Sequence, residues 1–447
     1  MRAQAQAAPS VQHSREPGGS LQKSWCVESR SKSPVSFRTF DASGKMSFFE
    51  NVTGEPDVML ESASKLPSLK ALKPATKDAD AIALQRDLET LHSRKGVPSA
   101  KAMVFLSTHE NGVGSTINSL VLAVLDVLGK RNTLFSPPLA LWSQREVCER
   151  KDLSCYFSSL PTVGNETAWA RVLRSMAPSS GADRVKLARD KCREANIECP
   201  HLVTKTYSEK SNELEILRRL PDRWLRNGRF WLVSQVLHFL TQPNEDLQAR
   251  LAKARTDARL DQAQSMGPIL GVHVRNGDAC KGRGECRRLV DFMPSVRRVA
   301  ALYGIQSILL ASPSLEVQEE TKRYSEFAWY FVPIPHESAT AQMKAKGVDK
   351  IEDGLLRRTN SPTFFSPAGE WQRFMIDMYL LASCNAFVGS FSSNGARLAY
   401  SLMAANGEKG CLKPFHSGDM NWCWAYGRFD PDINRRDSQP TGSYSSC

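Results

Sequence analysis

Between residues 268 and 405 the chain alternates short apolar runs with longer segments of amphipathic pattern. The apolar runs "GPILGVHVR", "QSILLAS", "AWYFVPI" and "AFVGSF" have the length and composition of buried β-strands. The segments between or after them, such as "PSVRRVAALYG", "SLEVQEETKRYS", "QRFMIDMYLLASC" and "NGARLAYSLMAANG", repeat apolar residues at helical spacing. This alternation predicts a doubly wound α/β sheet, because parallel strands need crossover connections and those are usually helices.

A shorter alternation of the same kind begins near residue 100. The runs "AMVFLS" and "NTLFS" are predicted strands on either side of a helix at 117–129. Ser115 or Thr116 is the expected N-cap of that helix. One face of the helix carries its apolar side chains, namely Ile117, Leu120, Val121, Val124 and Leu128. The segment is a βαβ unit and therefore predicts a second parallel sheet.

A chain of 447 residues is long enough for two domains. We predict two Rossmann-like domains that face each other across a cleft, at 99–260 and 261–431. Further helices are expected at 167–175, 183–195, 229–241 and 244–258, and the last two bridge the domains. Residues 1–98 are rich in Ser, Lys, Pro and Gly, so we expect them to be disordered or loosely attached, like the tail at 432–447.

The net charge of +12 favours an anionic partner, such as nucleic acid, an anionic membrane or a ligand with phosphate groups. Lysines and arginines that only keep the protein in solution would give the same total. No five consecutive residues carry like charge, which argues against a nucleic-acid-binding tail.

Eleven cysteines occur without any C-x-x-C motif, so a zinc ribbon or a thioredoxin-like motif is not expected. Three pairs are close enough in sequence for local disulfides: 148 with 155, 192 with 199 and 280 with 286. Sequons at Asn51 and Asn165 also favour the secretory pathway over a cytosolic protein with free thiols. The longest apolar run, 120–129, is too short for a membrane span. No signal peptide is recognisable, so any membrane association is expected to need a leader that this sequence does not show.

The predicted strand at 268–274 leads directly into polar residues. Arg275 and Asp278 then lie at the carboxyl end of the sheet, where doubly wound folds bind ligands. The guanidinium of Arg275 suits bidentate contact with a phosphate, and Gly277 allows the backbone to approach a ligand closely. A structural ion pair between Arg275 and Asp278 is the alternative. His273 lies within the strand.

Two further loops are expected at the same edge. The loop "GSFSSNG" (389–395) supplies the hydroxyls of Ser392 and Ser393 and the N-terminus of the helix at 394–405. The loop "ENGVG" (110–114) precedes the helix of the first domain. A helix N-terminus has unpaired N–H groups and a partial positive charge, which suit a phosphate. An arginine, a helix N-terminus and a glycine turn together describe a diphosphate site, although the serines could also be ordinary N-caps.

Segments from about residue 100 to 425 resemble the α1,6-fucosyltransferases and, more distantly, the α1,2- and protein O-fucosyltransferases. They occur in the family's order. They are "NGVGS", "FWLVSQVLHFLTQPNEDLQARL", "GVHVRNGD", "FMIDMYLLASCNAFVGSFSSNGARLAYSLM" and "FHSGDMNW". The resemblance implies a GT-B type fold, GDP-β-L-fucose as donor, no metal or cofactor, and a place in the Golgi lumen. The acceptor would be a glycan or glycoprotein, with O6 of the innermost GlcNAc of N-glycans preferred.

The resemblance also implies roles for single residues. Arg275 would hold the β-phosphate with help from Ser393, while His273 and Asp377 would contact the guanine. Ser392 and the glycines Gly112 and Gly114 would complete the donor site. The general base would be Glu285, oriented by Asp278, or Asp278 itself. A core carboxylate with satisfied hydrogen bonds is the alternative for Asp377, which lies between apolar residues.

Several positions depart from the family's pattern. The second arginine of the family is Asn276 here, and Glu285 lies further from Arg275 than in the family. The acidic pair after the next strand is replaced by "ASPSLEV", and the cysteines that flank Phe-Ser-Ser are Gly389 and Ala396. Two alternatives therefore stay open: a fucosyltransferase with another glycan or a protein hydroxyl as acceptor, or a catalytically silent protein that binds nucleotide sugars or glycans.

Overall fold

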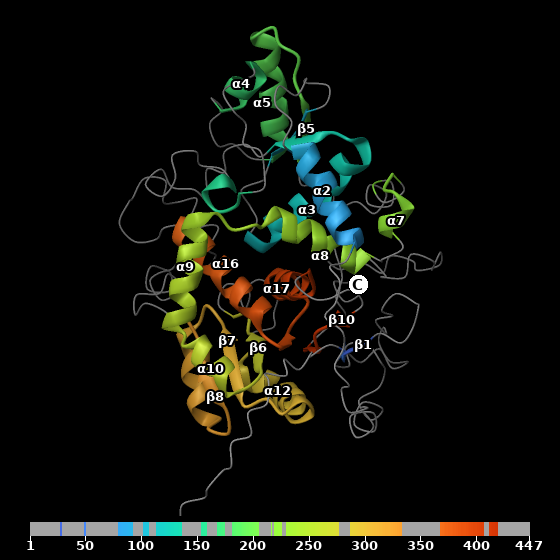
Figure 1. The fold of residues 1–447 in the computed structure, drawn as a ribbon. Coiled ribbons are helices and arrows are strands. Elements are labelled where there is room, and N and C mark those ends of the chain that lie inside the picture. Colours follow the sequence, from blue (N-terminus) through green and yellow to red (C-terminus); the bar gives the residue numbers. More distant parts are fainter. Residues whose placement is uncertain are drawn as a thin grey trace, which may run out of the picture.

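The structure is a computed structural model. The residues that it describes are 27–28, 49–50, 79–92, 102–106, 113–135, 153–158, 168–174, 181–204, 216, 219–225, 229–276, 287–332, 367–405 and 411–418. Figure 1 shows two sheets, one at the top of the molecule and one at the bottom, with a layer of helices between them.

The larger sheet has six strands in the order β2-β11-β9-β6-β7-β8. The five strands from β11 to β8 are parallel, and only β2 runs antiparallel to its neighbour β11. The predicted α/β class is confirmed by this sheet and its helices, and β11 is a strand that the sequence did not predict. The strands are β2 (Phe49–Glu50), β6 (Ile269–His273), β7 (Ser307–Ala311), β8 (Ala328–Tyr330), β9 (Ala386–Gly389) and β11 (Phe415–Ser417).

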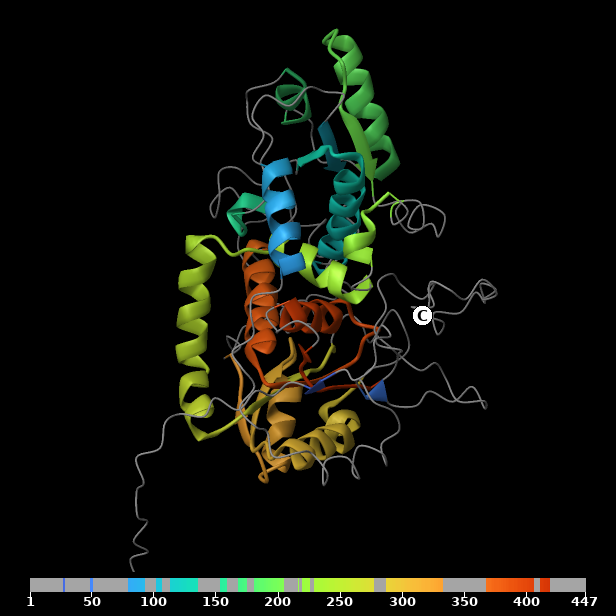
Figure 2. The same cartoon turned by 45° about the vertical axis from the view of Figure 1, so that its right-hand side comes forward.

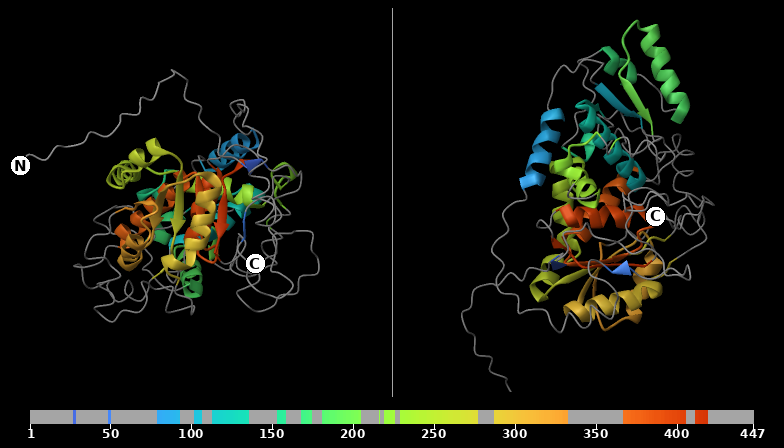
Figure 3. Two further views of the ribbon diagram at one scale, coloured as in Figure 1. Left: turned by 90° about the horizontal axis from the view of Figure 1, so that it is seen from below. Right: turned by 90° about the vertical axis from the view of Figure 1, so that its right-hand side faces the viewer.

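Every residue of the strands β6, β7, β9 and β11 is buried, as helices on both sides of the sheet require, whereas the edge strand β8 is partly exposed. Alternate residues of the strands point to opposite faces. Leu270 and Val272 of β6 pack on the side of α12 (Leu289–Tyr303). Ile269 belongs to the core on the other side, which is covered by α16 (Pro367–Ser383) and α17 (Asn394–Ala405). The right-hand view of Figure 3 shows the strands between these two layers of helices.

The smaller sheet has three parallel strands in the order β4-β3-β5. Helix α3 (Val113–Lys130) lies between the strands β3 (Ala102–Leu106) and β4 (Thr133–Phe135) in the sequence, and the two strands are parallel. The predicted βαβ unit is therefore confirmed. The expected cap is wrong: α3 begins at Val113, and Ser115 and Thr116 lie inside its first turn. The third strand, β5 (His201–Thr204), follows α5 (Gly181–Glu194).

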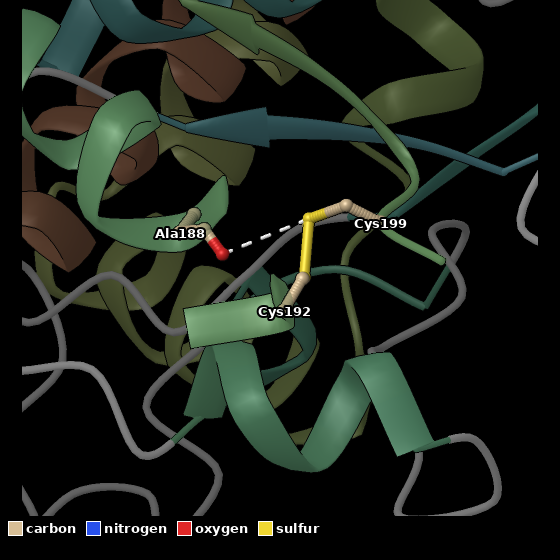
Figure 4. Close-up of a disulfide and its surroundings, with 3 residues drawn as sticks. All are labelled: Ala188, Cys192 and Cys199. Atoms are coloured by element: carbon tan, nitrogen blue, oxygen red, sulfur yellow. Dashed lines mark hydrogen bonds between the residues drawn. A yellow bond between two sulfur atoms is a disulfide. The ribbon is translucent and has the colours of Figure 1, made fainter. Parts of the chain in front are cut away.

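A disulfide joins Cys192 at the end of α5 to Cys199 just before β5, as predicted (Figure 4). The Sγ atom of Cys199 also lies 3.7 Å from the carbonyl oxygen of Ala188. Cys155 is disulfide-bonded as well. The other cysteines of the predicted pairs, at 148, 280 and 286, lie outside the described residues.

One apolar core connects the two sheets. It includes fully buried residues of α2 (Ala79–His92), α3, α8 (Arg229–Leu240), α16 and α17. Helix α8 packs on both α17 and α3, and α17 also packs on α3, so these helices connect the two sheets. Leu84 and Leu88 of α2 are 0% exposed. The expectation of a loose N-terminal segment is therefore wrong for residues 79–92, and the predicted domain boundaries stay predictions.

Helix α9 (Glu245–Asp257) lies along α16, as Figure 2 shows. Its N-cap is Asn244, whose Oδ1 accepts the N–H of Leu247 at 2.9 Å. The remaining described elements are β1 (Val27–Glu28), η2 (Leu153–Cys155), α4 (Ala168–Arg174), α7 (Asp222–Leu225), α10 (Leu260–Met266), α13 (Leu315–Glu320), η4 (Thr321–Arg323) and β10 (Cys411–Leu412). None of the helices in the described ranges combines the length and the apolar character that a membrane span needs.

Three histidines are buried in these cores. Burial lowers the pKa of His92 from 6.5 to about 4, although its hydrogen bond to Leu88 acts in the opposite direction. Burial, with a smaller effect of Arg275, lowers the pKa of His273 to about 3. Burial and the nearby Arg298 lower that of His416 to about 4. All three imidazoles are therefore neutral in the folded protein at neutral pH.

These low pKa values predict a loss of stability in mild acid. Below about pH 6.5 the unfolded chain takes up a proton at each of these histidines, whereas the folded protein does so only near pH 3 to 4. The free energy of unfolding should therefore fall as the pH decreases from about 6.5 to about 4. Urea titrations at several pH values measure this, and His92→Phe should reduce the slope, because it removes one of the three groups. Stability that is constant from pH 7 to pH 4.5 would contradict the prediction.

Candidate functional site

The carboxyl end of β6 forms one side of the candidate site. His273, its last residue, is only 5% exposed and lies on the side of α16 and α17. The N–H of Val274 donates to the carbonyl of Ala311 at 3.0 Å, which extends the pairing with β7 by one residue. Arg275 is the next residue and is half-buried, while Asn276 is buried. Arg275 thus lies where the sequence predicted it, directly beyond the end of a central strand.

The N-terminus of α17 forms a second side. The N–H of Ser393 donates to the carbonyl of Ser390 at 2.9 Å, so a turn leads from β9 into the helix. A Cβ atom at Gly395 would lie 3.0 Å from Nε2 of His273 and 3.2 Å from Cε2 of Phe374. The imidazole of His273 therefore packs directly against the first turn of α17, and glycine is what permits this approach.

Helix α3 of the smaller sheet brings its N-terminus to the same place. A Cβ atom at Gly114 would lie 2.8 Å from Cβ of Asn394, the first residue of α17. One turn further along α3, Nδ2 of Asn118 donates to Oδ1 of Asn394 at 2.8 Å. The described first turns of α3 and α17 contain no acidic residue. Two helix N-termini with partial positive charges thus converge beside His273.

Several buried polar atoms near this site have no hydrogen-bond partner in the described part of the protein, and two of them lie at the ends of β6 and β9. They are Nδ1 of His273 and Oγ of Ser390, and Ser390 is 4% exposed. A buried polar atom without a partner is costly, so each is suited to a ligand atom or a bound water. Because the imidazole is neutral, His273 offers one donor and one acceptor.

Helix α16 forms the third side. The ring of Phe374 lies close to both Gly114 and Gly395: a Cβ atom at either position would lie within 3.3 Å of a ring carbon. Asp377 follows Phe374 by three residues, hence on the same side of the helix, and is half-buried. This placement is compatible with the predicted ligand contact of Asp377.

Six of the predicted site residues lie within the described ranges, at the carboxyl end of β6, in the first turn of α3, in the middle of α16 and in the loop before α17. They are His273, Arg275, Asp377, Ser392, Ser393 and Gly114. Gly112, Asp278 and Glu285 lie outside the described residues. No group of three or more His, Cys, Asp or Glu side chains that could hold a metal is present among the residues with a described position. The roles of the individual residues stay predictions.

Sequence reasoning missed Asn118, Phe374, Ser390 and Asn394. The order Ser-Ser-Asn before a helix was a usable signal for Asn394, because asparagine is common at helix N-termini. Asn118 lies four residues after Gly114 on α3, so the glycine turn pointed to its neighbourhood. No local pattern indicated that Asn118 and Asn394 would meet.

No protein-family model matches the chain. A curated relative, the alpha-(1,6)-fucosyltransferase of Drosophila melanogaster, is 24% identical over 180 residues. This match covers 39% of the present chain and 25% of the relative, so the chain spans about a quarter of the length of the curated relative it matches.

The solved structures to which the chain is similar include three fucosyltransferases. A mutant of FUT1 from Arabidopsis thaliana in complex with GDP has 15% identity and a TM-score of 0.43, over 76% of this chain and 81% of that one. NodZ alpha-1,6-fucosyltransferase from Bradyrhizobium, co-crystallised with GDP, has 16% identity and a TM-score of 0.36, over 67% and 91%. POFUT1 in complex with GDP-fucose has 11% identity and a TM-score of 0.38, over 72% and 98%. The curated match thus confirms the similarity of this chain to the fucosyltransferase superfamily, with weak identity to the α1,6 family in particular.

Proposed function

We propose that this chain is an inverting, metal-independent glycosyltransferase that transfers L-fucose from GDP-fucose to a glycan hydroxyl. The acceptor that the resemblance favours is O6 of the innermost GlcNAc of N-glycans. The observation that carries the proposal is the convergence of Arg275 with the N-termini of α17 and α3 around His273. Donors and partial positive charges arranged in this way suit the diphosphate of a sugar nucleotide.

In the proposed reaction GDP leaves as the acceptor hydroxyl attacks the anomeric carbon from the opposite face. The β-linked fucose of the donor therefore becomes α-linked in the product. Negative charge grows on the diphosphate as the bond breaks, and Arg275 and the α17 N-terminus stabilise it. The acceptor hydroxyl loses its proton to a carboxylate, for which Glu285 and Asp278 are the two candidates. The positive groups neutralise the diphosphate without a metal ion.

The nucleoside is proposed to bind on the α16 side of the site. His273 and Asp377 contact the guanine, since both lie along the side where Phe374 packs. Ser392 and Ser393 contact the phosphates from the start of α17, and Gly112 and Gly114 let the α3 turn approach them. The two sheets with their helices are proposed to be the two lobes of a GT-B type fold.

The test is an assay of GDP release from GDP-fucose. It compares a biantennary N-glycan with terminal GlcNAc, other glycans and an unglycosylated polypeptide as acceptors. Release that depends on the N-glycan, with an α1,6 linkage in the product, supports the full proposal. Release with another acceptor supports a fucosyltransferase of different specificity. Saturable GDP binding without release from any acceptor would instead indicate a catalytically silent binding protein, and absence of GDP binding would refute the site.

The Golgi lumen is the proposed location. The Cys192–Cys199 disulfide supports an oxidising compartment, because such bonds rarely persist in the cytosol.

A further inference from the structure

One hydrogen bond between side chains joins a helix of the smaller sheet to a helix of the larger sheet beside the candidate site. Nδ2 of Asn118 on α3 donates to Oδ1 of Asn394, the first residue of α17, at 2.8 Å. Asn118 is half-buried, and the two residues are 276 positions apart in the sequence. The bond therefore depends on how the two sheets are placed against each other, and not on the local structure of either helix.

The ends of the two helices are also in direct contact. A Cβ atom at Gly114 would lie 2.8 Å from Cβ of Asn394, so there is no room for a side chain at position 114. Asn118 follows Gly114 by one turn on the same face of α3. The packing at Gly114 fixes how closely the helices approach. The hydrogen bond of Asn118 fixes their alignment, because its strength depends on direction as well as distance.

Asn394 is held within its own helix as well. Its Oδ1 also accepts a hydrogen bond from Nη2 of Arg397 at 2.5 Å, and an amide oxygen can accept both bonds. Loss of the Asn118 side chain would therefore leave Asn394 attached to α17, and would change chiefly the position of α3 relative to α17. Both partners of the bond are uncharged amides, so its contribution does not depend on the balance of charge between Arg397 and Asp377.

The next residue of α17 lies against the part of the site that suits a ligand. A Cβ atom at Gly395 would lie 3.0 Å from Nε2 of His273. Nδ1 of the same imidazole is buried and has no hydrogen-bond partner among the described residues. In the proposed function the diphosphate lies between the start of α3 and the loop before α17. The alignment of the two helices therefore decides whether both can contact the same diphosphate.

We propose that Asn118 is a positioning residue of the donor site, which aligns α3 with α17 so that both helix ends contact the diphosphate. It acts through Asn394. The inference rests on the proposed GDP-fucose site and deepens it, because it assigns part of that site to the smaller sheet. A site assembled from two sheets needs such a link, since ligand contacts tolerate displacements of only about 0.5 Å.

The experiment compares ligands that contain the diphosphate with ligands that lack it. Asn118→Ala removes the donor, and calorimetric titration measures the affinities of the wild type and the variant for guanosine, GMP and GDP. GDP binding should weaken about three- to tenfold, as expected for the loss of one hydrogen bond. Guanosine should bind as it does to the wild type, because the nucleoside is proposed to bind on the side of α16.

Asn385→Ala is the matched control. Asn385 is also half-buried, and its Oδ1 accepts the N–H of Ile269 at 2.9 Å. Ile269 is the first residue of β6, so this bond lies at the opposite end of the strand from the candidate site. Its loss should lower the midpoint of thermal unfolding, measured without nucleotide, and leave the affinity for GDP unchanged.

The other outcomes also have definite meanings. Unchanged GDP affinity of Asn118→Ala overturns the inference, as do equal losses for guanosine and GDP, or an equal loss of GDP affinity in Asn385→Ala. Asn118→Leu, which is close to asparagine in size, takes the place of the alanine variant if that variant does not fold. A protein that folds with neither substitution also overturns the inference, because Asn118 is then needed for the fold. A wild type that does not bind GDP refutes the proposed function, and the inference with it.

Discussion

Replacing Arg275 with alanine is expected to lower kcat/KM for GDP-fucose by about 10²–10³ or more. Arg275 lies directly beyond the end of β6 and is half-buried, where the proposed function puts the departing diphosphate. Loss of one donor that stabilises developing charge typically has an effect of this size on the rate. Steady-state kinetics of GDP release, with GDP affinity measured separately, show how much of the loss is in binding and how much in the reaction.

Arg323→Ala is the matched control, because Arg323 is an exposed arginine of η4, which lies between β7 and β8 of the larger sheet in the sequence. It removes the same charge from the protein and should leave kcat/KM unchanged. Arg275→Lys should fall between the wild type and the alanine variant, since an ammonium keeps the charge but loses the bidentate geometry. Full activity of Arg275→Ala would show that the diphosphate is bound elsewhere.

Replacing Trp371 with alanine is expected to reduce the free energy of unfolding by about 3–5 kcal/mol. Its side chain is 0% exposed and stacks on Tyr156, with ring centroids 4.7 Å apart and planes inclined by 20°. The ring of Phe157 lies against it as well, at 5.6 Å. The substitution leaves a large cavity where α16 meets residues 153–158, and the surrounding rings can fill it only in part.

Trp329→Ala serves as the comparison for this prediction. Trp329 lies on β8 at the edge of the larger sheet and is only half-buried, and its Nε1 donates to the carbonyl of Tyr324 at 2.9 Å. Its loss should cost clearly less stability. Urea unfolding followed by circular dichroism measures both variants, and equal effects of the two would argue against the packing described for Trp371.

The larger sheet could be predicted from the sequence because each of its central strands is a short apolar run between helical patterns. The predicted starts of the helices agree less well with the structure. Helix α12 was expected to begin at Pro294, a residue favoured in first turns, but it begins at Leu289. The carboxylate of Asp291 accepts the N–H of Arg288 at 2.7 Å and so caps this earlier start. Helix α3 likewise begins four residues before its predicted start, because Val113 and Gly114, the last two residues of the segment predicted to be a loop, belong to its first turn.

The candidate site was predictable only in part. His273 and Arg275 follow from one strand and its end, and Gly114 from a local glycine pattern. The contact between Asn118 and Asn394 joins residues separated by 276 positions, so no periodicity or motif in the sequence contains it. The burial of Arg397 is equally a product of tertiary packing, since arginine in an amphipathic helix is usually placed in water.

The continuous core through α3, α8 and α17 has a consequence for how a nucleotide could be exchanged. Leu232 and Val236 of α8 and Leu398 of α17 are fully buried in this core. A movement that separated the two sheets would expose such side chains to water. Each such side chain contributes about 1.5–3 kcal/mol by being buried. Separating the two sheets would therefore be costly, and a nucleotide that binds at the proposed site would have to enter by local movements of the chain.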